Sequence, residues 1–254
     1  MGAGASGQRL PVLGVPIDAL SMDQAVQRIA LLASAGQGGY ACLCNAHSVV
    51  TASRDVALAQ ALAGADLALP DGAPVAWMLR RQGAGQQRRV SGPDLMLAYC
   101  ANAAAQGEPI YLYGSTPETL AALQRELLRR WPGLRIAGAY SPPFRASTAV
   151  EDRADVARIN ASGARTVWVS LGCPKQELWM AAQRHQLHAV LIGVGAAFDF
   201  HAGRIARAPR WMRRSGLEWL HRLCREPRRL WRRYLVTNSL FIAGALAQWW
   251  RPRR

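Results

Sequence analysis

The sequence predicts an α/β protein: a mainly parallel, Rossmann-like sheet with helices on both faces, plus a basic helical C-terminal appendage. Up to about residue 200, short apolar runs alternate with helical stretches, as is typical of a parallel sheet covered on both sides. Beyond that residue, basic charge dominates. Half of the 254 residues are apolar, which is ample for a buried core. We therefore expect an α/β domain at residues 1–200 and an Arg/Trp-rich appendage at 201–254.

The expected elements follow from local signals in chain order. Ser21 and Gln24 form a capping box that begins a helix, and Gly36 ends it. Further helices are expected at 55–63, around Trp77, and after Thr116, where a proline occupies the first turn. The expected strands are residues 40–44, 65–69, 110–113, 135–140, 166–171 and 190–192.

Residues that directly follow the strands are the first candidates for a site, because parallel sheets bind ligands at the carboxyl ends of their strands. Each of these segments begins with a polar residue or glycine: Asn45, Asp71-Gly72, and residues 114–116, 172–176 and 193–199. Asp71 lies in a Pro-Asp-Gly turn, where Asp is also simply a good turn residue. At this edge its carboxylate can deprotonate a hydroxyl group.

Two segments suggest anion binding. Arg89 precedes a helix and is a candidate phosphate ligand, with an ordinary surface Arg as the alternative, while Asp94 is expected to cap or support the turn. The segment 172–177 opens a helix whose N-terminus suits an anion, and Lys175 adds positive charge. Ordinary helix-start chemistry is the alternative for this segment.

Motifs for cofactors and metals are missing from the sequence. Residues 193–199 are not a true Gly-x-Gly-x-x-Gly motif and are not expected to open a helix, and no Walker motif occurs. The five histidines show no metal spacing, and no Asp-x-Asp motif is present. We therefore expect no cofactor and a metal-independent reaction. The five cysteines have no zinc or Cys-x-x-Cys spacing and are expected to be free and buried, as in a reducing compartment.

The C-terminal segment carries most of the charge. Residues 201–254 contain 14 Arg and two acidic residues, a net +12, whereas residues 1–200 carry only +3. Such a segment implies an anionic partner: nucleic acid, anionic lipid or a diphosphate. Trp and Leu recur among these Arg, which suits a membrane–water interface. Residues 235–250 are shorter than the ~20 needed to span a bilayer. An interfacial helix, a helix packed on the domain, or both, are expected.

Several motifs, in this order and spacing, resemble the WecG/TagA/CpsF family of bacterial glycosyltransferases over roughly residues 10–235. They are Asn-Ala-His-Ser at 45–48, Pro-Asp-Gly at 70–72, Arg-Val-Ser-Gly-Pro-Asp at 89–94, Pro-Lys-Gln-Glu at 174–177, Gly-Val-Gly-Ala-Ala-Phe-Asp at 193–199, Arg-Ala-Pro at 207–209, Gly-Leu-Glu-Trp-Leu at 216–220, Arg-Leu at 222–223 and Glu-Pro at 226–227. Leu43 departs from the pattern, because some members have Thr there.

The resemblance implies an inverting, metal-independent transfer of a hexosyl group from a UDP-sugar to a sugar on undecaprenyl diphosphate, in cell-surface or exopolysaccharide biosynthesis. The sugar would be of the N-acetylmannosamine, N-acetylmannosaminuronic acid or glucose type. Asp71 matches the family's proposed general base. The positions that match its substrate-binding residues are Asn45, Arg89 and Gln176 in the donor and active-site pocket, and Arg222, Arg229 and Arg232 in the appendage that meets the lipid diphosphate.

The expected partners are therefore a UDP-sugar donor, a lipid-linked diphosphate sugar acceptor and an anionic membrane surface. The expected location is cytoplasmic, peripheral on the inner face of the cytoplasmic membrane. Two alternatives stay open: a nucleic-acid-binding protein that uses the Arg-rich tail, and a non-catalytic membrane scaffold of a polysaccharide complex. No nucleic acid is expected, because Trp and Leu interleave the tail Arg and the other 200 residues are nearly neutral.

Overall fold

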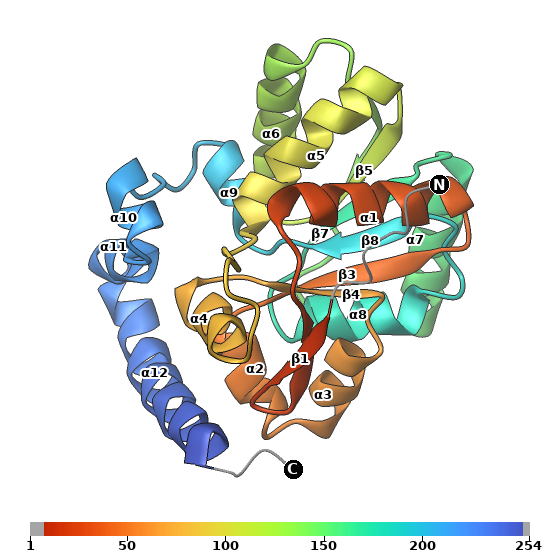
Figure 1. Ribbon diagram of the computed structural model, residues 1–254. Coiled ribbons are helices and arrows are strands. Elements are labelled where there is room, and N and C mark those ends of the chain that lie inside the picture. The colour runs from red at the N-terminus through yellow and green to blue at the C-terminus, as the bar shows by residue number, and fades with distance from the viewer. Residues whose placement is uncertain (1–7, 251–254) are drawn as a thin grey trace.

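The computed structural model describes residues 8–250, except for the side chains of Arg214 and Arg229. Its centre is a six-stranded, fully parallel sheet in the order β4-β3-β8-β7-β5-β6 (Figure 1). The strands are β3 (Gly39–Cys44), β4 (Leu67–Pro70), β5 (Pro109–Gly114), β6 (Arg135–Tyr140), β7 (Thr166–Ser170) and β8 (Val190–Gly193). The predicted α/β fold is thus confirmed. A separate antiparallel hairpin, β1 (Arg9–Val12) and β2 (Val15–Asp18), was not expected.

Helices cover both faces of the sheet, because alternate side chains of each strand point to opposite sides. In β3, Tyr40 and Cys42 belong to one hydrophobic core and Ala41 and Leu43 to the other. The first core is completed by α3 (Val56–Ala63), α7 (Ala149–Ala161) and α8 (Lys175–Gln183). The second is completed by α1 (Met22–Ala35), α5 (Gly92–Gln106) and α6 (Pro117–Arg130).

The local helix signals act as expected. Ser21 forms the capping box of α1, and Gly36 ends that helix in the left-handed conformation, with φ 66°. Thr116 caps α6 ahead of its first-turn proline. Three further short helices are α2 (Ala46–Ala52), α4 (Ala73–Arg81) and α9 (Ala197–His201). The expectation that residues 193–199 open no helix is wrong, because α9 begins at Ala197.

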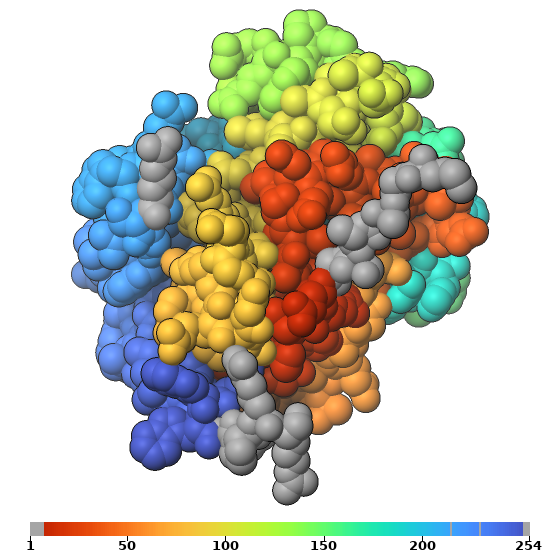
Figure 2. Space-filling model, viewed as in Figure 1, coloured from red at the N-terminus to blue at the C-terminus, as the bar shows by residue number. Residues whose placement is uncertain are grey.

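The appendage forms α10 (Arg210–Arg214), α11 (Glu218–Arg225) and α12 (Pro227–Trp250). Pro227 separates α11 from α12 because its ring suits only the start of a helix. Helix α12 packs against α2, with Leu230, Phe241 and Ala245 buried, and Figure 2 shows the blue C-terminal helices directly beside the gold segment that contains α4. Within residues 8–250, no helix is both long and apolar enough to cross a membrane.

Candidate active site

A cavity of about 620 Å³ opens at the carboxyl ends of β3 and β8. These neighbouring strands lead to helices on opposite faces of the sheet: α2 follows β3 on one face, and α9 follows β8 on the other. Such a switch point leaves a crevice in which α/β proteins bind ligands. The cavity is lined by the segments that follow β3, β4, β7 and β8, and by α11 and α12. The predicted ligand edge and the appendage therefore share one site.

Asp71 follows β4 and lines this cavity. The pKa of Asp71 is raised to about 6, chiefly by burial. The negative charge of Glu218 contributes to the rise, whereas the Arg89 charge and a hydrogen bond from Asn45 oppose it. Gly72 makes the turn, with φ 86°, and donates a backbone hydrogen bond to the carboxylate. A carboxylate with this pKa is ionised at neutral pH and is a stronger base than an exposed Asp.

Asn45 is held in place by the start of α2. Its Oδ1 accepts hydrogen bonds from the backbone N–H of His47 at 3.0 Å and of Ser48 at 3.1 Å. Because Oδ1 is engaged by the helix cap, the side-chain NH₂ is the group that bonds Asp71. The Asn-Ala-His-Ser motif thus orients the carboxylate through a helix cap.

Gln176 lies in the first turn of α8 and is buried beside the loop after β8. Its Oε1 accepts from the Gly195 backbone N–H at 3.2 Å, and its Nε2 donates to Glu177 Oε1 at 2.8 Å. Gly193 leaves room for this arrangement, since an added Cβ would lie 3.1 Å from Gln176 Nε2. Lys175, expected to add charge here, instead donates to the Arg145 carbonyl at 2.8 Å and does not line the cavity.

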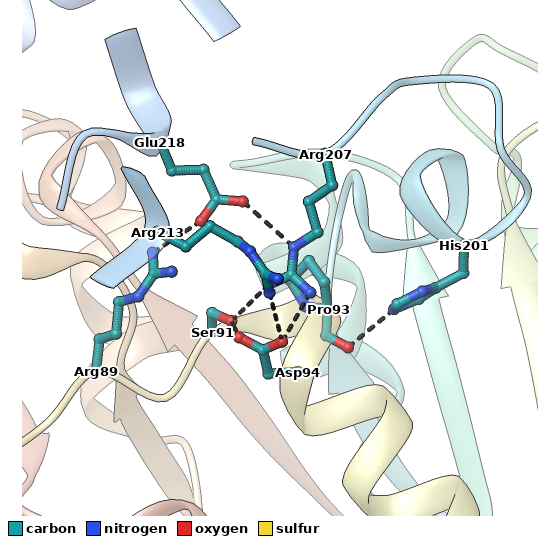
Figure 3. Close-up of polar contacts among 8 residues, drawn as sticks. All are labelled: Arg89, Ser91, Pro93, Asp94, His201, Arg207, Arg213 and Glu218. Carbon is teal, nitrogen blue, oxygen red and sulfur yellow. Dashed lines mark hydrogen bonds and ion pairs between the residues drawn. The ribbon is translucent and has the colours of Figure 1, made fainter. Parts of the chain in front are cut away.

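Arg89 lines the cavity and belongs to an ion-pair network that joins the appendage to the domain (Figure 3). Its Nη1 lies 2.8 Å from Oε2 of Glu218 in α11. The other oxygen of Glu218 lies 3.4 Å from Nε of Arg207, whose Nη1 lies 2.7 Å from Oδ1 of Asp94. Ser91 donates to the second Asp94 oxygen at 2.6 Å, so Asp94 supports the turn as expected. The network fixes α11 over the crevice.

Arg222 and Arg232, two of the appendage arginines that match the family pattern, have different surroundings. Arg222 lines the cavity with its guanidinium over the Phe200 ring, and its Nε is buried without a hydrogen-bond partner. Arg232 does not line the cavity and lies over the Trp231 ring instead. The side chain of Arg229 lies outside the described residues. Because α11 ends before Pro227, the spacing of these positions does not run along one helix.

Among the polar residues of the cavity that sequence reasoning missed are His47, Glu218 and Arg233. His47 is within hydrogen-bond reach of Thr237 in α12, at 3.5 Å. Burial, with a contribution from Arg233, lowers the pKa of His47 to about 4, so this imidazole is neutral at pH 7. His47 and Glu218 both lie in quoted motifs, whereas nothing local in the sequence marks Arg233.

Two further kinds of side chain concern the chemistry of the site: possible metal ligands and cysteines. In the part of the chain that the structure describes, no group of three or more His, Cys, Asp or Glu side chains is arranged to hold a metal ion. All five cysteines are free, but Cys224 is exposed, contrary to expectation. Cys173 lines the cavity, where burial and the neighbouring Glu177 raise the pKa of its thiol, which opposes thiolate formation.

A carboxylate of raised pKa beside arginines, at the switch point of a parallel sheet, is typical of enzymes that activate a hydroxyl group next to a phosphorylated ligand. The chain matches the model of the Glycosyl transferase WecG/TagA/CpsF family over residues 10–254. It belongs to this family and is a glycosyltransferase. The family implies, in general terms, a nucleotide-sugar donor and a lipid-linked acceptor in the synthesis of cell-surface polysaccharides.

Proposed function

We propose that the enzyme transfers a hexosyl group from a UDP-sugar to a sugar on undecaprenyl diphosphate, with inversion and without a metal ion. The sugar is of the N-acetylmannosamine, N-acetylmannosaminuronic acid or glucose type. The observation that carries the proposal is Asp71, a partly buried carboxylate whose pKa is raised chiefly by loss of solvent, in the same cavity as Arg89 and Arg222. Residues 1–200 act as the catalytic domain and 201–254 as an appendage that completes the cavity.

The chemistry is a single displacement. Asp71 accepts the proton of the acceptor hydroxyl while the hydroxyl oxygen attacks the anomeric carbon. The bond from that carbon to the UDP oxygen breaks on the opposite face, so UDP leaves with the electron pair and the configuration inverts. Asn45, which is fixed by the α2 cap, keeps the carboxylate oriented during this step.

Arginine side chains match the two diphosphates of such a reaction, because a guanidinium pairs with phosphate through two parallel hydrogen bonds. Arg89 and Gln176 lie on the domain side of the cavity and are assigned to the donor. Arg222 comes from the appendage, and its unpaired Nε is available to the acceptor diphosphate. Arg229 and Arg232 are assigned to the same acceptor, with Arg232 in an outer position.

The proposed location is the inner face of the cytoplasmic membrane. The side of α12 that faces away from the cavity exposes Val236 and Trp250, each about half exposed or more. Together with the +12 charge of residues 201–254, these side chains suit the interface of an anionic bilayer. Helix α12 would then contact the protein on one side and lipid on the other.

A donor screen tests the proposal. Several UDP-sugars are supplied with a short-chain lipid diphosphate acceptor, and released UDP is measured with and without acceptor. Acceptor-dependent UDP release from at least one of these donors is expected. If no donor releases UDP while the protein shifts DNA or RNA on a gel in a salt-sensitive way, the nucleic-acid alternative replaces the proposal.

A further inference from the structure

One face of α12 lines the cavity along most of the helix, and its chemistry changes with position. Near the catalytic end the lining residues are basic or polar: Arg233, Tyr234, Thr237 and Asn238. Farther along they are all apolar: Phe241, Ile242, Ala245, Leu246 and Trp249. They recur every three or four residues, so they form one stripe. At ~1.5 Å per residue the stripe is roughly 24 Å long.

The wall opposite this stripe is also apolar at the same end. Pro74 and Trp77, in the first two turns of α4, line the cavity directly after Asp71. At the far end, the Arg81 guanidinium of α4 lies over the Trp249 ring of α12, 4.9 Å from its centroid. We call the space between α4 and residues 241–249 of α12 the apolar arm. It leads away from the carboxylate and the arginines.

The width of the apolar arm is set by contacts that hold α12 at both ends. Gln248 accepts from the Leu13 N–H at 2.8 Å and donates to the Pro11 carbonyl at 2.7 Å, which fastens the helix to the β1–β2 turn. At the other end, the Tyr234 ring packs edge-on against the Trp219 ring of α11, with centroids 5.7 Å apart. The arm is therefore preformed, and apolar surface in such a space is unfavourable in water until an apolar group covers it.

A ligand that fits both ends has an anionic head and an apolar tail. We propose that the apolar arm binds the first isoprene units of the acceptor lipid while its diphosphate lies near Arg222 and Arg233. The inference rests on the proposed function, and it adds a binding site for the chain itself. The lipid would leave the bilayer between α4 and α12, so the protein recognises the chain directly.

The test uses water-soluble acceptors, with neither membrane nor detergent present. The same sugar diphosphate carries either a methyl group or a ten-carbon isoprenoid chain, and KM is measured for each. Each methylene-sized group removed from water favours binding by roughly fourfold. The KM of the ten-carbon acceptor should therefore be at least about 100-fold below that of the methyl acceptor. Transfer to both with equal KM would overturn this inference alone. Transfer to neither would overturn the proposed function and the inference with it.

Two pairs of variants place the effect in the apolar arm. Ala245→Leu fills the arm and should raise the KM of the ten-carbon acceptor about tenfold relative to that of the methyl acceptor. Ala243→Leu makes the same change at an exposed position that does not line the cavity, so it should not alter this ratio. Because a larger residue at 245 can displace α12, a second test is Ile242→Ser, which removes apolar lining without adding bulk. Its control is Val236→Ser, because Val236 is exposed to a similar degree but does not line the cavity. Equal KM ratios in Ala245→Leu, Ile242→Ser and both controls would overturn the assignment.

Discussion

Replacing Glu218 with Gln is expected to move the acidic limb of the pH–activity profile to lower pH. The Glu218 carboxylate raises the pKa of Asp71, whereas Arg89 lowers it, and burial has the largest effect. Since these effects together place the pKa of Asp71 at about 6, roughly nine-tenths of the enzyme carries the ionised base at pH 7 and about one-tenth at pH 5. Activity should therefore fall about tenfold between these pH values.

The assay is kcat/KM for the acceptor between about pH 4.5 and 8, because this ratio reports pKa values of the free enzyme. Glu218→Gln should shift the midpoint down, and Arg89→Gln should shift it up, since each removes a charge of opposite sign. Glu126→Gln, in an exposed ion pair on α6, serves as the control and should leave the midpoint unchanged. A wild-type midpoint near 4, or shifts of the same sign in the Glu218 and Arg89 variants, would refute the electrostatic reasoning.

Three further predictions concern the metal, the appendage and the acceptor. Activity should survive excess EDTA, and a complete loss that Mg²⁺ or Mn²⁺ restores would reveal a metal requirement. A chain that ends at Glu226 lacks α12, so it should keep the α/β fold by circular dichroism but lose transfer to the lipid-linked acceptor. It should also float less with anionic liposomes. High salt should reduce the flotation of the wild-type protein in the same way, because salt screens surface charge. Arg222→Gln should raise the acceptor KM about 10–100-fold, the usual effect of losing a hydrogen bond to a charged group. Arg232→Gln should raise the acceptor KM less, because Arg232 does not line the cavity. Equal KM values in these two variants would contradict the assignment.

Most of the domain follows from short-range signals in the sequence. The capping box at Ser21, the C-terminal Gly36 and the Thr116 cap were all identified because each acts within a single turn of helix. The β1–β2 hairpin was missed because its turn is Leu13-Gly14, with φ 49° at Leu13. Asn-Gly or Asp-Gly is the usual sequence for such a turn, and Leu rarely adopts a positive φ.

The site was predicted less completely, because part of it depends on how distant segments pack. Asn45 and Asp71 were found from their place after strands, which the parallel topology brings together. The pairing of Arg89 with Glu218 joins residues 129 positions apart, and no local pattern predicts it. Residue spacing alone also did not show that Arg233 of α12, rather than Arg232, lines the cavity.

The most direct test of the account is the turnover of Asp71→Asn with saturating UDP-sugar and lipid diphosphate acceptor. Asn keeps the shape of the side chain but cannot accept the proton, so turnover should fall by about 10²–10⁴-fold. Donor affinity, measured separately by calorimetry, and the melting temperature should change little. Turnover equal to wild type, with donor binding intact, would show that Asp71 is not the base and that the cavity works by another mechanism.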